Sequence, residues 1–258
     1  MTPETYLRGL QSMSRLDQFR AVKEQVFAWL DLQPGEHALD VGCGTGADAL
    51  VMARTVGPSG RVVGIDSAEA MIAHAQHVLN AEHANGLPVS YELGDAQAIA
   101  FPDAGFDAAH AERVFQHLTD PQAALAEMIR VTCTGGRVLV ADVDWGMAGL
   151  DGSDRELTQR ILDHTARAVR QGWIGRRLNG LFRQAGLRDV RVAPVGLLFD
   201  SYDDGARENW RWTADRAQDA GVVTATEVLA FLADLEERGH HGTYFSVITM
   251  FIAIGYKG

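Results

Sequence analysis

The stretch Ala38-Leu-Asp-Val-Gly-Cys-Gly-Thr-Gly46 constrains the fold more than any other part of the chain. A short apolar run leads into three glycines, Gly42, Gly44 and Gly46, which stand at every second position. Glycine is used where φ must be positive or where a ligand approaches the backbone. Residues 47–56 have the pattern of a helix, whose first N–H groups would point at the same place. The stretch therefore predicts a strand, a ligand-binding turn and a helix in direct succession.

Outward from this stretch, strands and helices alternate along the chain with short turns between them. Apolar, β-branched runs predict strands over residues 37–41, 61–65, 88–93, 106–110, 137–143, 190–198 and 244–256. Helical periodicity predicts helices over residues 18–32, 47–56, 68–84, 121–131, 153–170, 174–185, 203–220 and 226–237. This order favours an α/β fold with a doubly wound, mostly parallel, seven-stranded sheet and a helical insertion before the last strand.

Acidic residues recur where the predicted strands end, at Asp40, Asp66, Asp95, Glu112 and Asp142. The carboxyl ends of parallel strands lie at one edge of a sheet, where such folds bind ligands. Asp66 can accept both hydroxyls of a ribose there, although a carboxylate at a helix N-terminus can also simply offset the helix dipole. We expect a ligand site at this edge.

The glycine spacing alone does not identify the ligand. A dinucleotide fold needs G-x-G-x-x-G, and its third position falls on Ala47, a residue that the motif tolerates. Asp40, two residues before the first glycine, can face a cationic amino acid ligand instead. A nucleotide-dependent oxidoreductase therefore stays open at this point.

Charge and composition narrow the class of partner. The 258 residues carry a formal net charge of -11, which disfavours a nucleic-acid partner because such binding needs a basic face. A local basic patch or a solvated helix face are two interpretations of the arginines at 167, 170, 176, 177 and 183. No signal pattern and no apolar run of membrane-spanning length occur, so we expect a soluble, cytoplasmic protein that does not enter a membrane. Two cysteines and the isolated pair His240-His241 give no metal-ligand pattern, so no metal site is expected.

The motifs together resemble those of a known family. Residues 38–46 resemble the first motif of class I S-adenosylmethionine-dependent methyltransferases, and residues 63–67 with Met71 resemble their second-strand motif. Residues 94–107 resemble the segment that contacts adenine, and residues 125–140 resemble the helix, turn and fifth strand of the ubiquinone/menaquinone-biosynthesis-like (type 11) branch. That branch usually has Pro-Gly-Gly before its fifth strand, where this chain has Thr134-Gly-Gly.

The resemblance implies S-adenosylmethionine as cofactor and S-adenosylhomocysteine as its product. It implies that Gly42 and Gly44 hold the methionyl part, that Asp66 binds the ribose, and that Asp95 takes the adenine amino group. The full set of cofactor-binding residues that we expect is Asp40, Gly42, Gly44, Asp66, Ser67, Met71, Asp95, Ala96, Glu112 and Arg113. It further implies an N-terminal helical lid, with Met13, Ser14 or Arg15 near the cofactor.

Methyl transfer is an in-line displacement, so positioning supplies most of the catalysis and a base is needed only where the acceptor loses a proton. His117 is the candidate base because it follows the fourth strand and its ordinary pKa suits proton transfer near neutral pH. Asp142 or Asp144, at the end of the fifth strand, can orient it. Capping of the next helix is the alternative role for His117.

We expect one domain over residues 1–258, with a cofactor-binding core at about 18–145 and acceptor-binding and lid elements at about 1–17 and 146–243. Aromatic residues in the last hundred positions suit a small-molecule acceptor, methylated on O, N or C, of the kind used in secondary metabolism. The alternatives are a protein or nucleic-acid methyltransferase and a protein of this fold that catalyses a non-methylating reaction. We expect a monomer or a homodimer.

Overall fold

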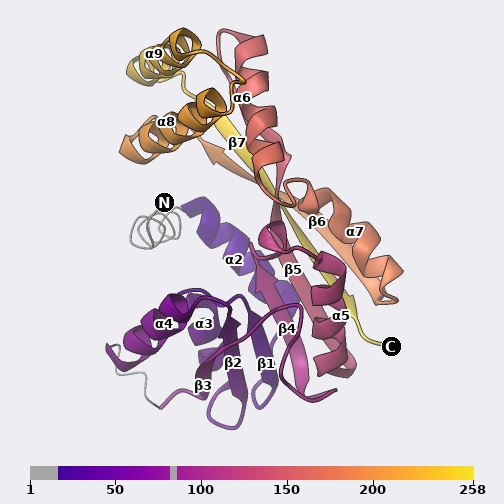
Figure 1. Ribbon diagram of the computed structural model, residues 1–258. Coiled ribbons are helices and arrows are strands. Elements are labelled where there is room, and N and C mark those ends of the chain that lie inside the picture. The colour runs from indigo at the N-terminus through magenta and orange to yellow at the C-terminus, as the bar shows by residue number, and fades with distance from the viewer. Residues whose placement is uncertain (1–16, 82–85) are drawn as a thin grey trace.

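The computed structural model describes residues 17–81 and 86–258, and side chains from Arg20 onward (Figure 1). The first half contains α2 (Asp17–Leu30), β1 (His37–Val41), α3 (Ala47–Val56), β2 (Arg61–Asp66), α4 (Glu69–Ala81), β3 (Val89–Leu93), β4 (Phe106–Glu112), the 3-10 turn η1 (Phe115–His117) and α5 (Pro121–Val131). The second half contains β5 (Thr132–Leu150), α6 (Arg155–Ala168), α7 (Ile174–Gln184), β6 (Arg188–Phe199), α8 (Asp204–Asp219), α9 (Ala225–His241) and β7 (Ser246–Tyr256).

The strands form one seven-stranded sheet in the order β3-β2-β1-β4-β5-β7-β6. Strands β1 to β5 pair in parallel, whereas β7 pairs antiparallel with both β5 and β6. The chain reverses direction across the sheet between β1 and β4, which creates the switch point at which such folds bind ligands. The prediction of a doubly wound, mostly parallel sheet is confirmed.

The fifth strand is longer than the sequence indicated. Residues 133–136 were expected to form a turn, but they belong to β5, whose register against β4 shifts between the pairs of Phe106 and Ala108. Gly135 has φ 80° there and donates its N–H to the carbonyl of Lys257, so the segment is an irregular part of the strand. At its other end β5 continues past residue 143 to Leu150, because β7 pairs with it up to Asp144 and, after an irregularity, again at Gly149 and Leu150.

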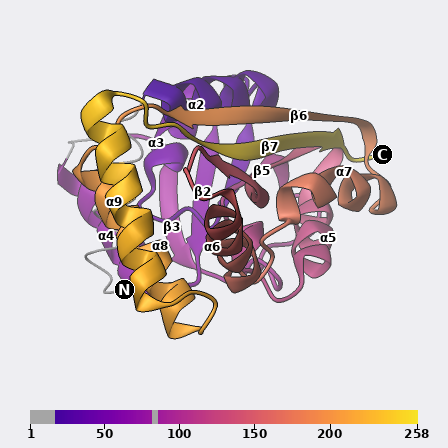
Figure 2. The same ribbon diagram turned by 90° about the horizontal axis from the view of Figure 1, so that it is seen from above.

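Helices cover both faces of the sheet (Figure 2). One face packs against apolar side chains of α2, α3 and α4, such as Val26, Met52 and Ile72. The other face packs against α5 and α7, through residues such as Leu125, Met128 and Phe182. Because both faces of the central strands are covered, those strands are buried almost throughout.

A third group of helices stands beyond the carboxyl ends of the strands. Helices α6, α8 and α9 gather around a separate apolar cluster that includes Ile161, Ala214, Phe231 and Leu235 (Figure 1). The long strands β5, β6 and β7 run from the main sheet up to this group, which we call the cap. Helices α8 and α9 lie between β6 and β7 in sequence, so the predicted insertion before the last strand is confirmed.

Candidate functional site

The glycine turn after β1 has the left-handed backbone that its sequence predicts. Gly42, Gly44 and Gly46 have φ of 70°, 53° and 81°. A Cβ added at Gly42 would overlap Val114, and one at Gly46 would overlap Tyr91. A Cβ at Gly44 would meet nothing within 4 Å. Two of the three glycines therefore allow close packing inside the protein, and Gly44 is the one whose α-carbon faces open space.

Asp66, at the end of β2, stabilises this turn through hydrogen bonds to backbone N–H groups. Its Oδ2 accepts the N–H of Gly44 at 2.9 Å, and its Oδ1 accepts the N–H of Ala68 at 2.8 Å. Each carboxylate oxygen keeps a second lone pair, so the side chain can still accept ligand hydroxyls. Next to it Ser67 is exposed, while Met71 on α4 is buried. The structure thus brings Gly44 and the predicted ribose acceptor into direct contact.

Asp95 and Ala96 follow β3 on the same edge. Asp95 is exposed, and its Oδ1 accepts the N–H of Gln97 at 2.9 Å, whereas Ala96 is buried. This short local bond fixes the carboxylate at the end of β3. The position is the one that the sequence indicated for an adenine contact.

The end of β4 carries Glu112 and Arg113. Arg113 has φ 57°, an unusual conformation for a residue other than glycine, and its N–H donates to Ala141 on β5. Its Nε lies 3.4 Å from Oε1 of Glu112, whose side chain is buried. Backbone strain of this kind gathers at functional sites, where the surrounding structure holds it in place.

A buried charged group beneath the turn was not foreseen from the sequence. His110 on β4 lies beside Asp40 on β1, with Nδ1 2.9 Å from Oδ1, and both side chains are buried. Lys23 on α2 reaches Asp48 on α3 at 2.5 Å and Glu112 at 2.7 Å. No local pattern marks these pairs, because Asp40 and His110 stand 70 residues apart and meet only through strand pairing.

Three side chains of this group, Asp48, His110 and Glu112, are spaced closely enough to hold a metal ion. The ammonium of Lys23 already supplies a cation between Asp48 and Glu112, so the arrangement is complete as an ion-pair network. We therefore treat the group as a network of charged side chains.

Asp142 and Asp144 make different contacts from those expected. Asp142 accepts the N–H groups of Gln116 at 3.0 Å and Val143 at 2.8 Å, and burial raises its pKa to about 7. Asp144 accepts two N–H groups of the Arg176 guanidinium at 2.6 and 2.7 Å. Within residues 17–81 and 86–258 neither carboxylate is hydrogen-bonded to His117, so the expected orienting pair is not formed. Asp142 holds the backbone of the η1 turn instead.

His117 ends η1 with its side chain partly exposed. Partial burial, followed by the charges of Arg113 and Arg170, lowers its pKa below the ordinary value, which favours the neutral imidazole. The segment after α6 reaches the same place, because the N–H of Gln171 donates to the carbonyl of Gln116. The Gln116 side chain in turn accepts a hydrogen bond from Trp145 Nε1 at 2.7 Å. Sequence analysis missed Gln116, which carries no charge and matches no motif.

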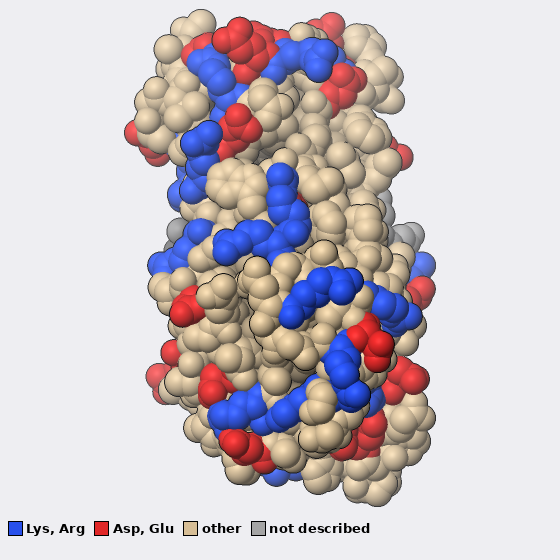
Figure 3. Space-filling model, turned by 90° about the vertical axis from the view of Figure 1, so that its right-hand side faces the viewer, with Lys and Arg blue, Asp and Glu red and all other residues tan. Residues whose placement is uncertain are grey.

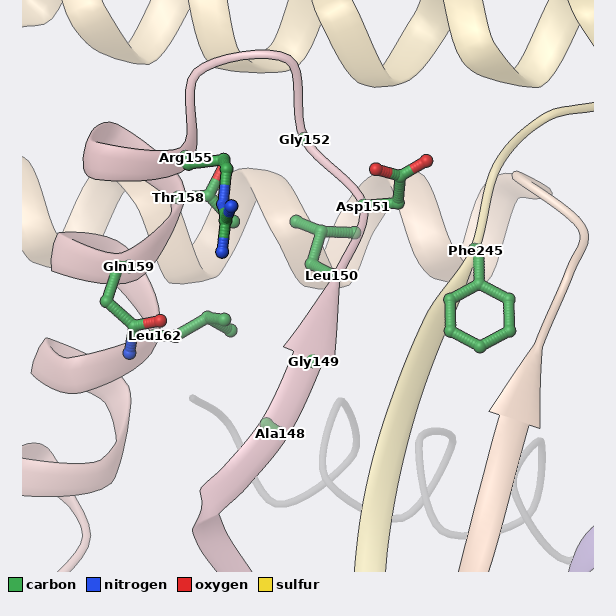
Figure 4. Close-up of a pocket in the computed structure, with 10 residues that line it drawn as sticks. All are labelled: Ala148, Gly149, Leu150, Asp151, Gly152, Arg155, Thr158, Gln159, Leu162 and Phe245. Carbon is green, nitrogen blue, oxygen red and sulfur yellow. The ribbon is translucent and has the colours of Figure 1, made fainter.

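A pocket of about 520 Å³ lies under the cap (Figure 4). Arg155, Gln159 and Leu162 come to it from α6, Leu150 from the end of β5, and Phe245 from the segment before β7. Apolar and polar groups are mixed in its lining.

The right-hand face of the molecule carries a band of basic side chains (Figure 3). All five arginines of the predicted patch, at 167, 170, 176, 177 and 183, are exposed, and α7 contains no acidic residue. Arg176 is held by Asp144, while Arg177 and Arg183 bond to neutral amides. The band is the solvated face of α7 and its flanks.

The residues at this edge fit the cofactor that the motifs imply. Asp40 Oδ2 and Glu112 Oε2 are buried and accept no hydrogen bond from the described residues, whereas Glu112 Oε1 lies 2.7 Å from the ammonium of Lys23. Buried carboxylate oxygens of this kind need a donor, which an ammonium group can supply. Together with the open face of Gly44 and the remaining lone pairs of Asp66, they suit a nucleoside with a cationic amino acid end.

Comparison with known proteins supports this assignment. A family model described as a methyltransferase domain matches residues 32–186, which is more than half of the chain. The chain belongs to the methyltransferase domain family. The resemblance to class I S-adenosylmethionine-dependent methyltransferases is thereby confirmed, and S-adenosylmethionine is the cofactor of that class.

Two relatives and one solved structure illustrate the range of similarity. An uncharacterized 37.1 kDa protein in transposon TN4556 of Streptomyces fradiae is 35% identical over 248 residues, 95% of this chain and 69% of that protein. The nocamycin O-methyltransferase of Saccharothrix syringae is 38% identical over 132 residues, 51% of this chain and 46% of that enzyme. The crystal structure of a putative methyltransferase from Bacillus halodurans has a TM-score of 0.61 at 20% identity and covers 90% of this chain and 96% of that one.

This methyltransferase chain spans only about half the length of the named methyltransferases that it matches. In the parts of the chain that the structure describes, no helix is both long and apolar enough to cross a bilayer. The predicted lid residues Met13, Ser14 and Arg15 lie outside the described residues.

Proposed function

We propose that this chain transfers the methyl group of S-adenosylmethionine to a small-molecule acceptor, most simply to a hydroxyl group. The observation that carries the proposal is the pairing of an open Gly44 with Asp66, next to buried carboxylates at the ends of β1 and β4. The nocamycin relative is by its name an O-methyltransferase, which supports an oxygen acceptor.

In this proposal each residue of the turn has a separate task. The backbone at Gly44 lies against the cofactor, Asp66 accepts the ribose hydroxyls, and Asp95 accepts the adenine amino group. Ser67, Met71 and Ala96 line the nucleoside, while Gly42 allows Val114 to pack beneath the turn. Asp40 and Glu112 face the ammonium of the methionyl end, and Arg113 offsets the charge of Glu112.

The cofactor supplies an activated methyl carbon bound to a cationic sulfur. When bound, it would give this methyl group to the acceptor oxygen, and His117 would accept the proton that the acceptor hydroxyl loses. The lowered pKa of His117 keeps the imidazole neutral, so it can accept this proton. Arg113 and Arg170 nearby favour a negative charge that develops on the acceptor oxygen.

The acceptor is proposed to bind between the main sheet and the cap, in the region of residues 146–243, with the pocket at the end of β5 taking its distal part. Residues 18–145 would then form the cofactor-binding core. We also infer a cytoplasmic monomer or homodimer, and both cysteines are free, as in a reducing compartment.

Titration calorimetry tests the donor half of the proposal. S-Adenosylmethionine and S-adenosylhomocysteine should both bind, while NAD gives no heat beyond dilution. Asp66→Asn should weaken both at least about tenfold, because an amide accepts fewer hydrogen bonds than a carboxylate. Glu69→Gln, an exposed change on the first turn of α4, is the matched control and should leave both affinities unaltered. Binding of NAD without S-adenosylmethionine would refute the proposal.

Turnover separates methyl transfer from non-methylating use of the cofactor. Incubation with methyl-labelled cofactor and a panel of phenols, enols and carboxylic acids should transfer label to an organic product. Consumption of an acceptor with no label transferred would favour the non-methylating alternative. That alternative is relevant because a crystal structure of a [4+2]-cyclase shares the fold, with a TM-score of 0.58 at 24% identity.

A further inference from the structure

The buried charged group beneath the glycine turn contains more ionisable side chains than the proposed chemistry uses. His110 pairs with Asp40 through Nδ1 and Oδ1, and its Nε2 is buried without a hydrogen-bond partner among the described residues. Lys23 lies between Asp48 and Glu112. The imidazole is fully buried on β4, opposite Asp40 of β1, which stands two residues before the glycine turn.

The groups facing His110 come from every element packed around it. Asp40 faces it from β1, Asp48 from α3 and Glu112 from farther along β4, while Lys23 approaches from α2. Phe27 of α2 covers the ring with a centroid distance of 6.3 Å, and the β5 neighbours opposite β4 at this level are apolar. Three carboxylates thus surround one imidazole in a place from which water is excluded.

Formal charge in this group balances when the Asp40–His110 pair holds one titratable proton, which Nδ1 of His110 and Oδ1 of Asp40 share through their hydrogen bond. The three carboxylates face two permanent cations, Lys23 and the Arg113 guanidinium beside Glu112. Burial alone would lower the pKa of His110, but the hydrogen bond to Asp40 and the charges of Asp40, Asp48 and Glu112 outweigh it and raise the pKa. The proton completes a neutral cluster, and a further positive charge at the site would displace it.

We propose that His110 makes the site distinguish donor from product by charge: it keeps its proton beside the neutral sulfur of S-adenosylhomocysteine and releases it beside the cationic sulfur of S-adenosylmethionine. The inference rests on the proposed function, because it needs the cofactor at this turn. His110 does not touch the cofactor in this proposal, and acts through the charge of the Asp40 pair.

The consequence is a coupling between pH and ligand preference. A neighbouring unit charge in a desolvated site changes a pKa by about one or more. By linkage, the ratio of S-adenosylmethionine affinity to S-adenosylhomocysteine affinity should then rise about tenfold as pH increases through the titration of His110. At higher pH the neutral imidazole favours the cationic donor, and at lower pH the charged imidazole favours the product.

Calorimetry on the intact chain tests this without knowledge of the acceptor. Each ligand is titrated at several values between about pH 5.5 and 8.5, in phosphate and in Tris, whose different ionisation enthalpies reveal the protons released. The donor should release more protons than the product, and the affinity ratio should rise with pH. His110→Gln should make proton release equal for the two ligands and the ratio flat. Asp142→Asn, the matched control for another buried group, should preserve the wild-type difference.

Equal proton release for the two ligands in the wild type would overturn the inference, as would a His110→Gln protein that keeps the difference. Loss of the difference in Asp142→Asn but not in His110→Gln would assign it to Asp142 and also overturn it. Failure of both ligands to bind would instead refute the proposed function.

If His110→Gln does not fold, histidine-selective isotope labelling of the wild type gives the second measurement. One buried imidazole should be charged with S-adenosylhomocysteine and neutral with S-adenosylmethionine, and identical spectra would contradict the inference.

Discussion

At the scale of single residues, the three glycines of the turn differ although their spacing makes them look equivalent. Gly42 and Gly46 leave room for Val114 and Tyr91, so they serve packing within the protein. Gly44 alone faces open space and donates its N–H to Asp66. The backbone at Gly44 is therefore where a substitution should affect the cofactor more than the fold.

Gly44→Ala is expected to lower the free energy of unfolding by about 1 kcal/mol, because alanine is strained at a positive φ. It should weaken S-adenosylmethionine binding at least about tenfold, because the new methyl group occupies the open face. Gly242→Ala is the matched control, with φ 66° and nothing within 4 Å of an added Cβ, but at the end of α9. Denaturation should show similar losses of stability in the two variants, and calorimetry should show a loss of cofactor affinity in Gly44→Ala alone. Equal cofactor affinities of the two variants would contradict a cofactor contact at Gly44.

His117→Ala should reduce turnover about 100-fold at neutral pH if the acceptor loses its proton to the imidazole. Cofactor affinity should stay within about twofold, because the side chain lies beyond the glycine turn. The initial rate with a reactive acceptor and the calorimetric affinity are the two measurements. A near-normal rate would remove His117 as the base and leave positioning as the main source of catalysis.

Titration of the Asp142 carboxyl should make the free energy of unfolding depend on pH. Its folded pKa of about 7 lies above that of an unfolded aspartate, so its contribution is complete below the unfolded pKa and is lost as pH rises through 7. Each difference of one between the folded and the unfolded pKa corresponds to about 1.4 kcal/mol. The rise from 3.8 to about 7 therefore limits the loss in the free energy of unfolding to about 4 kcal/mol. Urea denaturation between about pH 5 and 8 should show this decline, with a shallower slope in Asp142→Asn. Parallel curves for the two proteins would exclude Asp142 as its source.

At the scale of elements, helix α2 is connected to the site by one partly buried side chain, Lys23. Its apolar residues Val22, Val26 and Leu30 pack on the sheet, as the helical spacing indicated. Lys23 adds ion pairs to α3 and β4, and these give the helix a fixed position next to the glycine turn. An amphipathic pattern predicts such a helix but does not predict which carboxylates its lysine will reach.

Lys23→Met should lower the free energy of unfolding by about 3 kcal/mol, since it leaves two mostly buried carboxylates without their cation. Glu24→Gln is the matched control at the next position of the same helix, where the exposed carboxylate lies 3.9 Å from Arg20, and should cost less than about 0.5 kcal/mol. Chemical denaturation of both variants measures the difference. Equal small losses would show that the Lys23 network contributes little to the fold.

The edge strand β6 shows how the sheet ends. Pro194 stands in the middle of the strand, and a proline cannot donate a hydrogen bond to a further strand. Arg188 and Arg191 add charge along the same edge, and Gly196 weakens its propensity. These features disfavour pairing with a second chain through β6, so a dimer would have to use another surface.

At the scale of the whole molecule, the cap and the main sheet have separate apolar clusters joined by the long strands β5, β6 and β7 (Figure 1). The residues proposed to bind the cofactor belong to the sheet, whereas the pocket beside α6 belongs to the cap. This arrangement supports the proposed division of labour between donor and acceptor binding.

Leu235→Ala in the cap cluster should cost about 3 kcal/mol of local stability, because the side chain is fully buried. Hydrogen exchange should accelerate in α8 and α9, while S-adenosylmethionine affinity stays within about twofold and acceptor turnover falls. Leu229→Ala, 68% exposed on the same helix, should leave all three unchanged. A loss of cofactor affinity of about tenfold in Leu235→Ala would contradict the division.

Local sequence determined the part of the site that lies close together along the chain. The glycine spacing required a turn with positive φ, Asp66 and Asp95 ended strands, and parallel strands place such ends at one edge. The element order and the late helical insertion also followed, because periodicity and turn residues act over a few positions. The same local patterns predicted the wrong ends for β5, because the length of this strand is set by its pairing with β7.

The tertiary structure alone decided which charged groups meet. Asp40 and His110 are adjacent because β4 lies beside β1, and Arg176 rather than His117 reaches Asp144 because α7 crosses that end of β5. Such contacts depend on strand order and register between segments far apart in sequence, which local propensities do not encode. The sequence by itself therefore determined the fold class and the glycine turn with its positive φ angles, and only the folded chain decided which charged groups are buried beneath that turn.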